Sequence, residues 1–222
     1  EHLLGQHYDT PFFFSSNALK QVGYLTVELK KIYRQQDEQF ISLLNQIREN
    51  KASEETLQAL NQRYIPNFVP PKEGNYIRLT THNAPAQYIN EQQLAALPAQ
   101  AYSFTAEVEG NFPESSYPAD FKLILKPGAQ VMFIKNDPQH RFYNGMIGEV
   151  IGVKTDENGS KIIVRSKDSG EELELEKMEW TNAKYTLNEK TKEIEETVEG
   201  KFMQYPLRLA WAITIHKSQG LT

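Results

Sequence analysis

A polar cluster near the end of the sequence has side chains of the types that bind nucleic acid. The segment 207–222 reads LRLAWAITIHKSQGLT, in which an apolar run passes directly into that cluster. The cluster comprises Thr214, His216, Lys217, Ser218 and Gln219. These side chains supply short hydrogen-bond donors and one positive charge, which suit phosphate oxygens and hydroxyls. Gly220 can adopt a left-handed conformation that lets the backbone approach a ligand. A buried element with a polar end is the alternative interpretation.

A second polar cluster follows a short strand predicted at 77–81. Thr81 and Asn83 lie at its carboxyl end, before a helix predicted from about Ala84 to Leu97. Small polar residues at that point are where α/β sheets bind ligands and anions. From the residues alone, a helix-capping role for Asn83 is about as well supported as ligand binding. For His216, a core position with a hydrogen bond to a backbone carbonyl is the alternative.

Arg34 lies between a strand predicted to end near Tyr33 and a helix predicted from the N-cap Asp37 to about Asn50. A guanidinium is planar and permanently charged, so it can bind two phosphate oxygens and stabilise charge that develops during phosphoryl transfer. From its position alone, a surface arginine is the favoured interpretation. A further helix is predicted after Ser53, on which apolar residues share one face.

The composition limits the class of protein. The chain has 222 residues, no cysteine and a formal net charge of −5, and it contains no long apolar run. We therefore expect one large or two small domains in a reducing, cytoplasmic setting, without a membrane span. A protein that binds DNA through bulk positive charge is disfavoured, as is a sequence-specific DNA-binding protein, so any contact with nucleic acid must be local.

The segment 129–206 has a different pattern from the rest of the chain. Short strand-like runs alternate with glycine-containing turns at intervals of roughly ten residues, which is typical of a small antiparallel barrel. One long strand is predicted over 172–180, with Glu172, Glu174 and Glu176 on its solvated face. No His or Asp supports a metal site there, so none is predicted.

Four stretches resemble the RecD/Pif-type superfamily one DNA helicases. A-W-A followed by T-x-H-K-S-Q-G resembles their motif V, and YRQ-x-D-x-x-F-x-x-L-L-N-x-I-R resembles their motif IV. LTTHN-x-x-x-x-x-IN and K-x-GAQVM are similar to two further stretches of that family. The fold implied is α/β, a partial second RecA-like motor domain with an inserted SH3-like barrel. The implied boundaries are 1–128 for the motor domain, 129–206 for the insert and 207–222 for the return to the motor domain.

The resemblance also implies roles for single residues. Arg34 would contact the γ-phosphate of ATP, and Gln35 and Gly220 would help to bind the nucleotide. The expected contacts to the single-stranded DNA backbone are Thr81, Asn83, Thr214, His216, Lys217 and Ser218. The complete protein would use ATP and Mg²⁺, move 5′ to 3′ on single-stranded DNA, unwind duplex, and serve DNA repair or recombination.

The phosphate-binding half of such a motor is missing from these residues. The sequence contains no G-x-x-x-x-G-K-[ST] and no strand that ends in Asp-Glu. We therefore expect the chain to be a fragment that needs an N-terminal motor domain of the same protein. Alone it is expected to bind no cofactor, to lack ATP hydrolase activity and to bind single-stranded DNA weakly. The alternative is a non-catalytic SH3-like module that binds a protein partner through Trp180, Tyr185 and Tyr205.

Overall fold

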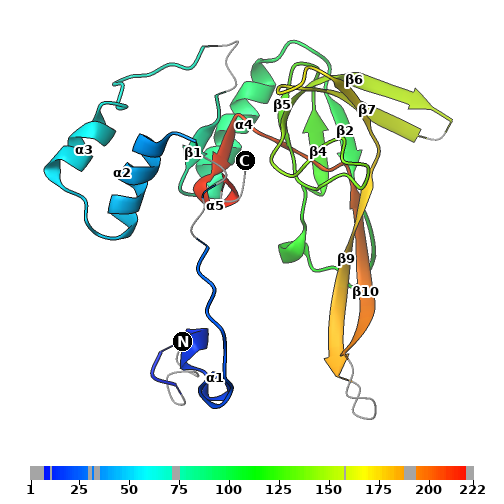
Figure 1. Ribbon diagram of the computed structural model, residues 1–222. Coiled ribbons are helices and arrows are strands. Elements are labelled where there is room, and N and C mark those ends of the chain that lie inside the picture. Colours follow the sequence, from blue (N-terminus) through cyan, green and yellow to red (C-terminus); the bar gives the residue numbers. More distant parts are fainter. Residues whose placement is uncertain are drawn as a thin grey trace. The chain divides into compact units, whose positions relative to one another are not determined.

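The protein forms two compact units, Glu1–Asn67 and Phe68–Thr222, seen in a computed structural model (Figure 1). The structure describes residues 8–10, 12–29, 32, 36–71, 76–157, 159–187 and 194–218. Among these residues, no helix is long and apolar enough to cross a membrane.

The first unit is helical. Its elements are η2 (Phe13–Ser15), α1 (Asn17–Gln21), α2 (Glu38–Arg48) and α3 (Glu54–Asn61). Asp37 caps α2, since its Oδ1 accepts a hydrogen bond from the Phe40 amide at 3.0 Å. Ser53 and Thr56 form a reciprocal capping box at the start of α3. Both predicted helices and both N-caps are therefore confirmed.

The prediction of a strand that ends near Tyr33 is wrong for residues 23–29, the described part of that segment. Residues 23–29 are extended but pair with no described strand. The apolar side chains that suggested a strand, Tyr24, Leu25, Val27 and Leu29, are 69% to 92% exposed. Alternation gives a segment the pattern of a half-buried strand, but a strand forms only where a neighbour supplies the hydrogen bonds.

The second unit begins with a parallel strand pair. The pair consists of β1 (Arg78–Thr80) and β12 (Ala212–Thr214), with α4 (Asn83–Ala96) after β1 and α5 (Ile215–Ser218) after β12. The predicted strand at 77–81 and the predicted helix after it are confirmed. Lys126 donates from Nζ to the Leu97 carbonyl at 2.8 Å, which places a cation at the end of α4 where the helix dipole favours one.

The other strands of the second unit are antiparallel (Figure 1). A five-stranded sheet contains β11 (Leu207–Leu209), β5 (Gln130–Phe133), β6 (Ile147–Asp156), β7 (Gly159–Ser166) and β8 (Glu172–Leu175), in that order. A three-stranded sheet contains β3 (Glu107–Gly110), β10 (Ile194–Gln204) and β9 (Met178–Leu187), in that order. β2 (Tyr102–Thr105) pairs with β4 (Lys122–Leu125), and η3 (Glu114–Ser116) lies between β3 and β4.

The antiparallel part differs from the predicted barrel in three respects. No sheet closes on itself in the part of the chain that the structure describes. The strand predicted over 172–180 is interrupted after Leu175. One of the glycine-containing turns expected from the sequence pattern, at Glu199 and Gly200, is instead a bulge inside β10. A Cβ at Gly200 would lie 2.4 Å from the Asn111 carbonyl oxygen, so this close backbone approach requires glycine.

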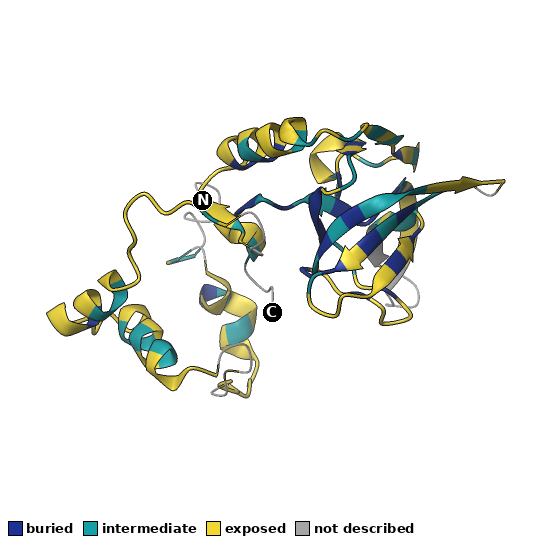
Figure 2. Cartoon of the chain, turned by 90° about the horizontal axis from the view of Figure 1, so that it is seen from above, coloured by how far each residue is buried: buried dark blue, intermediate teal, exposed yellow. Residues whose placement is uncertain are grey.

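Buried apolar residues are concentrated in the antiparallel strands (Figure 2). Leu125 of β4, Val131 of β5 and Leu207 of β11 are fully buried in one cluster. Strands on both sides of residue 128 therefore share a single core. In the first unit α2 buries no residue and α3 buries only Thr56.

The acidic strand face is neutralised by neighbouring strands. Leu173 and Leu175 point inward, as predicted. On the opposite face each glutamate has a basic partner, and the three ion pairs are Arg165–Glu172, Lys154–Glu174 and Lys161–Glu176. This face therefore carries little excess charge.

A tight loop after β5 contains an ion pair in which the carboxylate is buried and the guanidinium is partly exposed. Arg141 donates from Nε to Asp137 at 2.8 Å and from Nη2 at 2.9 Å, and its backbone amide donates to the same carboxylate at 3.1 Å. The Asp137 side chain is only 4% exposed. The Arg141 hydrogen bonds lower the pKa of Asp137 to about 2.

Asp137→Asn is expected to destabilise the fold by about 1–3 kcal/mol at neutral pH, because it breaks charge-assisted hydrogen bonds in a buried site. The ionised carboxylate stabilises the fold fully above about pH 4, and this stabilisation is lost as the pH falls towards about 2. Urea denaturation at pH 7 and at about pH 3 should show the difference from the natural protein shrinking at the lower pH. Glu172→Gln, at an exposed pair, is the control and should change stability by less than about 0.5 kcal/mol. A pH-independent difference would contradict the role of the carboxylate charge.

Candidate nucleic-acid interface

The parallel pair brings together the two polar segments singled out in the sequence. Thr80 at the end of β1 is in register with Thr214 at the end of β12. Thr81 and Asn83 follow the first strand, and the helical turn that contains Lys217 follows the second. Because the strands are parallel, both segments lie at the same edge of the sheet.

Asn90 on α4 holds β12 in place. Its Oδ1 accepts from the Ala212 amide at 2.8 Å, and its Nδ2 donates to the Ala212 carbonyl at 2.8 Å. The side chain is 8% exposed. Because the buried side-chain amide of Asn90 binds both backbone polar groups of Ala212, it fixes the distance between α4 and β12. We did not assign this role from the sequence, although Asn90 lies within the LTTHN-x-x-x-x-x-IN stretch.

Gln130 of β5 supports the approach to the same strand. Its Nε2 donates to the Ala210 carbonyl at 2.9 Å and to the Tyr76 carbonyl at 3.2 Å. Tyr76 precedes β1 and Ala210 precedes β12, so one side chain anchors the entrances of both parallel strands. The interface is thus built on backbone positions fixed by buried amides.

The first polar segment is exposed at the start of α4. Thr81 Oγ1 lies 2.8 Å from His82 Nδ1, and Thr80 Oγ1 donates to the His82 carbonyl at 2.9 Å. His82 is the N-cap residue of α4 and Asn83 is its first helical residue. The alternative in which Asn83 caps the helix is therefore wrong, and its side chain is exposed.

The second polar segment has buried and exposed members. Thr214 is 5% exposed, whereas His216 and Lys217 are exposed on the single turn of α5. The alternative that His216 is a core residue is therefore wrong. Ser218 donates from Oγ to the Ile215 carbonyl at 2.7 Å, so its proton is directed at its own helical turn.

A groove of about 520 Å³ runs beside this edge of the sheet. Its lining includes Asn83, Thr214 and Lys217 from the parallel pair and its flanking helices, and Lys122 and Arg208 from the antiparallel strands. Partial burial lowers the pKa of Lys217, the nearby Arg208 charge lowers it further, and Asp120 opposes both effects. Polar donors and several cations therefore share one concave surface.

The predicted nucleotide-binding residues Arg34, Gln35 and Gly220 lie outside the described residues. Nothing in the described structure bears on their roles. Among the described residues, no cluster of His, Asp or Glu side chains is arranged to hold a metal ion.

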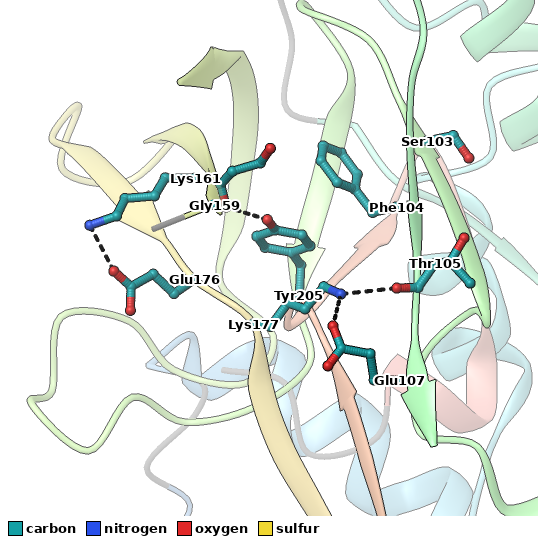
Figure 3. Close-up of a pocket in the computed structure, with 10 residues that line it drawn as sticks. Ser103, Phe104, Thr105, Glu107, Gly159, Lys161, Glu176, Lys177 and Tyr205 are labelled. Atoms are coloured by element: carbon teal, nitrogen blue, oxygen red, sulfur yellow. Dashed lines mark hydrogen bonds and ion pairs between the residues drawn. The ribbon is translucent and has the colours of Figure 1, made fainter. Parts of the chain in front are cut away.

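A second cavity, of about 500 Å³, lies among the antiparallel strands (Figure 3). Tyr205 and Phe104 meet edge to face there, with ring centroids 4.8 Å apart. Lys161 pairs with Glu176 at 2.7 Å, and Lys177 pairs with Glu107 at 2.6 Å. The cavity has as many negative as positive side chains, so it has no excess positive charge with which to bind a phosphate.

Of the aromatic side chains proposed for a protein-binding module, Tyr205 is buried and Trp180 is only partly exposed. Tyr205 is 2% exposed and donates to the Ser160 carbonyl. Trp180 packs against Phe202, and Lys135 Nζ lies 4.7 Å from its ring centroid. The Tyr185 side chain is outside the described part.

Comparison with known proteins supports the resemblance seen in the sequence. No family model matches the chain. It is 32% identical over 214 residues to the ATP-dependent DNA helicase Pif1 of Bdellovibrio bacteriovorus, an alignment that covers 94% of this chain and 45% of that protein. The crystal structure of Bacteroides sp. Pif1 in complex with ADP-AlF4 matches it with a TM-score of 0.82 and 37% identity, covering 100% of this chain and 49% of that one. Bacteroides Pif1 bound to ssDNA matches with a TM-score of 0.63 and 38% identity, with the same coverage.

The mixed α/β fold and these similarities define the chain as a homologue of ATP-dependent DNA helicases. More particularly, it is a homologue of the Pif1 family helicases and spans about half the length of Pif1 proteins. The predicted resemblance to RecD/Pif-type helicases is confirmed.

Proposed function

We propose that the chain is the DNA-binding part of the second motor domain of an ATP-dependent DNA helicase. The complete protein would move 5′ to 3′ on single-stranded DNA and unwind duplex. The observation that carries the proposal is the meeting of two polar segments, 81–83 and 214–218, beside a groove with several cations. A relative with the same fold is bound to ssDNA.

The proposed DNA contacts use mostly neutral donors. Thr81, Asn83, His216 and Lys217 would bind backbone phosphates from the exposed edge of the parallel pair, and Thr214 would do so from within the groove. Ser218 would bind a phosphate only by turning its hydroxyl proton away from the Ile215 carbonyl, because a DNA phosphate offers acceptors and no donors. Because few full charges contribute to binding, the DNA strand can be released, as stepwise movement along it requires.

The nucleotide side of the proposal needs residues beyond those described. Arg34, Gln35 and Gly220 would face ATP bound by an N-terminal motor domain of the same protein, and Arg34 would stabilise charge on the transferred phosphoryl group. Mg²⁺ would be held with the ATP phosphates by that other domain, which would supply the phosphate-binding loop that this sequence lacks. The chain alone would therefore neither bind ATP productively nor hydrolyse it.

The proposed domain organisation follows the family resemblance. Residues 1–128 and 207–222 would belong to the RecA-like domain, and 129–206 would form an SH3-like insert. We place the complete protein in the cytoplasm. A protein-binding module is the weaker proposal, because Tyr205 is buried and Trp180 is covered by Phe202 and Lys135.

Lys217→Ala is expected to weaken binding of a fluorescein-labelled oligo-dT by about fivefold to tenfold, since it removes one phosphate contact. Fluorescence anisotropy on the full 222-residue chain, over about 20–200 mM salt, measures both affinity and its salt dependence. The slope of log affinity against log salt should fall in magnitude by about 0.7. Lys154→Ala is the matched control, because that lysine is paired with Glu174 on the neutralised sheet face. Oligo-dT binding that is equal for both variants and the natural chain would refute the assigned site.

A further inference from the structure

The groove beside the parallel pair has a second wall to which no role has been assigned. This wall is made by Phe121, which precedes β4, by Lys122, the first residue of β4, and by Arg208 in β11. The Phe121 ring is an exposed aromatic surface, with 47% of the residue accessible. The wall belongs to the antiparallel strands, whereas the residues predicted to bind DNA belong to the parallel pair and its flanking helices.

Gln204 fixes the second wall from inside the core. Its side chain is fully buried, and its Nε2 lies 3.2 Å from the Asp120 carbonyl and 3.3 Å from the Phe121 carbonyl. Its Oε1 accepts from the Tyr205 amide at 3.0 Å. The backbone beneath the exposed ring is therefore held rigidly.

Two further contacts orient the wall. Arg208 donates from Nη2 to the Pro118 carbonyl at 3.2 Å, which leaves its other guanidinium donors available. The Tyr117 ring stacks on Phe121 at a centroid distance of 6.0 Å and an interplanar angle of 18°. One face of Phe121 is thus backed by another ring.

The groove has more positively charged side chains than the carboxylates beside them can neutralise. Lys122, Arg208 and Lys217 line it together with the carboxylates Glu91 and Asp120. Within the described part of the chain, none of these three cations has a carboxylate within ion-pair distance, in contrast to the paired face of the five-stranded sheet. Partial burial lowers the pKa of Lys217, and repulsion by the Arg208 charge lowers it further, while Asp120 raises it. A bound phosphate would relieve that repulsion.

We propose that the second wall completes the single-strand track, so that one nucleotide occupies the groove with its phosphate bound by Arg208 and Lys217 and its base stacked on Phe121. The volume of about 520 Å³ is within the range of small-ligand sites. An aromatic ring beside a basic groove is how proteins bind single strands without sequence preference. The inference rests on the proposed DNA-binding function and adds a base-stacking position to it.

Two variants separate the two contacts. Arg208→Gln is expected to weaken oligo-dT binding about fivefold to tenfold and to lower the salt slope by about 0.7, as one lost phosphate contact does. Phe121→Ala is expected to weaken binding about tenfold with an unchanged salt slope, because stacking releases no counterions. Arg165→Gln and Tyr143→Ala serve as a matched arginine and a matched aromatic control outside the groove.

An abasic oligonucleotide tests stacking directly. The natural chain should bind it about tenfold more weakly than oligo-dT, whereas Phe121→Ala should bind the two equally. Arg208→Lys keeps the positive charge and should bind oligo-dT within about threefold of the natural chain. That result would show that weak binding by Arg208→Gln comes from the lost charge and not from misfolding.

The outcomes distinguish this inference from the proposed function. If the natural chain does not bind oligo-dT, both are overturned. If Lys217→Ala weakens binding while Arg208→Gln and Phe121→Ala bind like the natural chain, only the second wall is overturned. Equal salt slopes in the natural chain and Arg208→Gln would likewise exclude a phosphate contact at Arg208.

Discussion

Replacing Arg34 with alanine in the complete helicase is expected to lower ATP turnover about a hundredfold or more, while single-stranded DNA affinity changes by less than about threefold. A residue that contacts charge developing on the transferred phosphoryl group contributes mainly in the transition state, so its loss lowers kcat rather than binding. Steady-state ATP hydrolysis with saturating oligo-dT and anisotropy titrations on the same preparations give the two quantities.

Two matched variants make the Arg34 experiment specific. Arg34→Lys keeps the positive charge but loses the planar fork, so we expect activity between that of the natural protein and the alanine variant. Arg48→Ala removes an exposed arginine of α2 and should leave turnover unchanged. An equal loss of turnover and of DNA affinity in Arg34→Ala would exclude the proposed role.

Asn90→Ala is expected to destabilise the protein by about 2–4 kcal/mol, because it leaves the Ala212 amide and carbonyl without their buried partner. Urea denaturation measures this loss. Hydrogen exchange at the Ala212 amide should also become faster than in the natural protein, since its acceptor is removed.

The neighbouring variant Gln92→Ala is the control for Asn90→Ala. Gln92 is exposed on the same helix, and alanine is a better helix former, so its effect should stay within about 0.5 kcal/mol. A loss below about 0.5 kcal/mol in Asn90→Ala would show that β12 is held by other contacts.

Elements with strong local signals could be predicted from the sequence. Asp37 and Ser53 are caps that act on residues three positions away, and they marked α2 and α3 correctly. The alternation around Leu173 also gave the correct inward face. The prediction from the alternation after Gly23 was wrong because a strand depends on a partner, which can lie anywhere in the chain.

Long-range contacts explain what the sequence did not predict. Asn90 acts on Ala212, 122 positions away, and Gln204 acts on carbonyls 83 and 84 positions away. Phe121 and Arg208 match no short motif, so the second wall of the groove was missed. The polar segments at 81–83 and 214–218 were found because short donors follow each apolar strand, while their register required the fold.

The distribution of charge agrees with a local DNA contact in an acidic protein. Arg165, Lys154 and Lys161, which lie in β6 and β7, are paired with Glu172, Glu174 and Glu176 respectively. The basic side chains in the groove have no such partners within the described structure. A net charge of −5 therefore does not argue against a basic track, because the charges that matter are the unpaired ones.

The β9–β10 hairpin continues past the end of β3. Its outer five residue pairs, from Val198↔Ala183 to Ile194↔Leu187, lie beyond the bulge, and no third strand among the described residues pairs with them. At about 3.3 Å per residue they form an arm of about 16 Å. A change of about 10° in its direction at the bulge would displace the outer end by about 3 Å, so a small change of angle at the bulge would produce a larger displacement at the end of the arm.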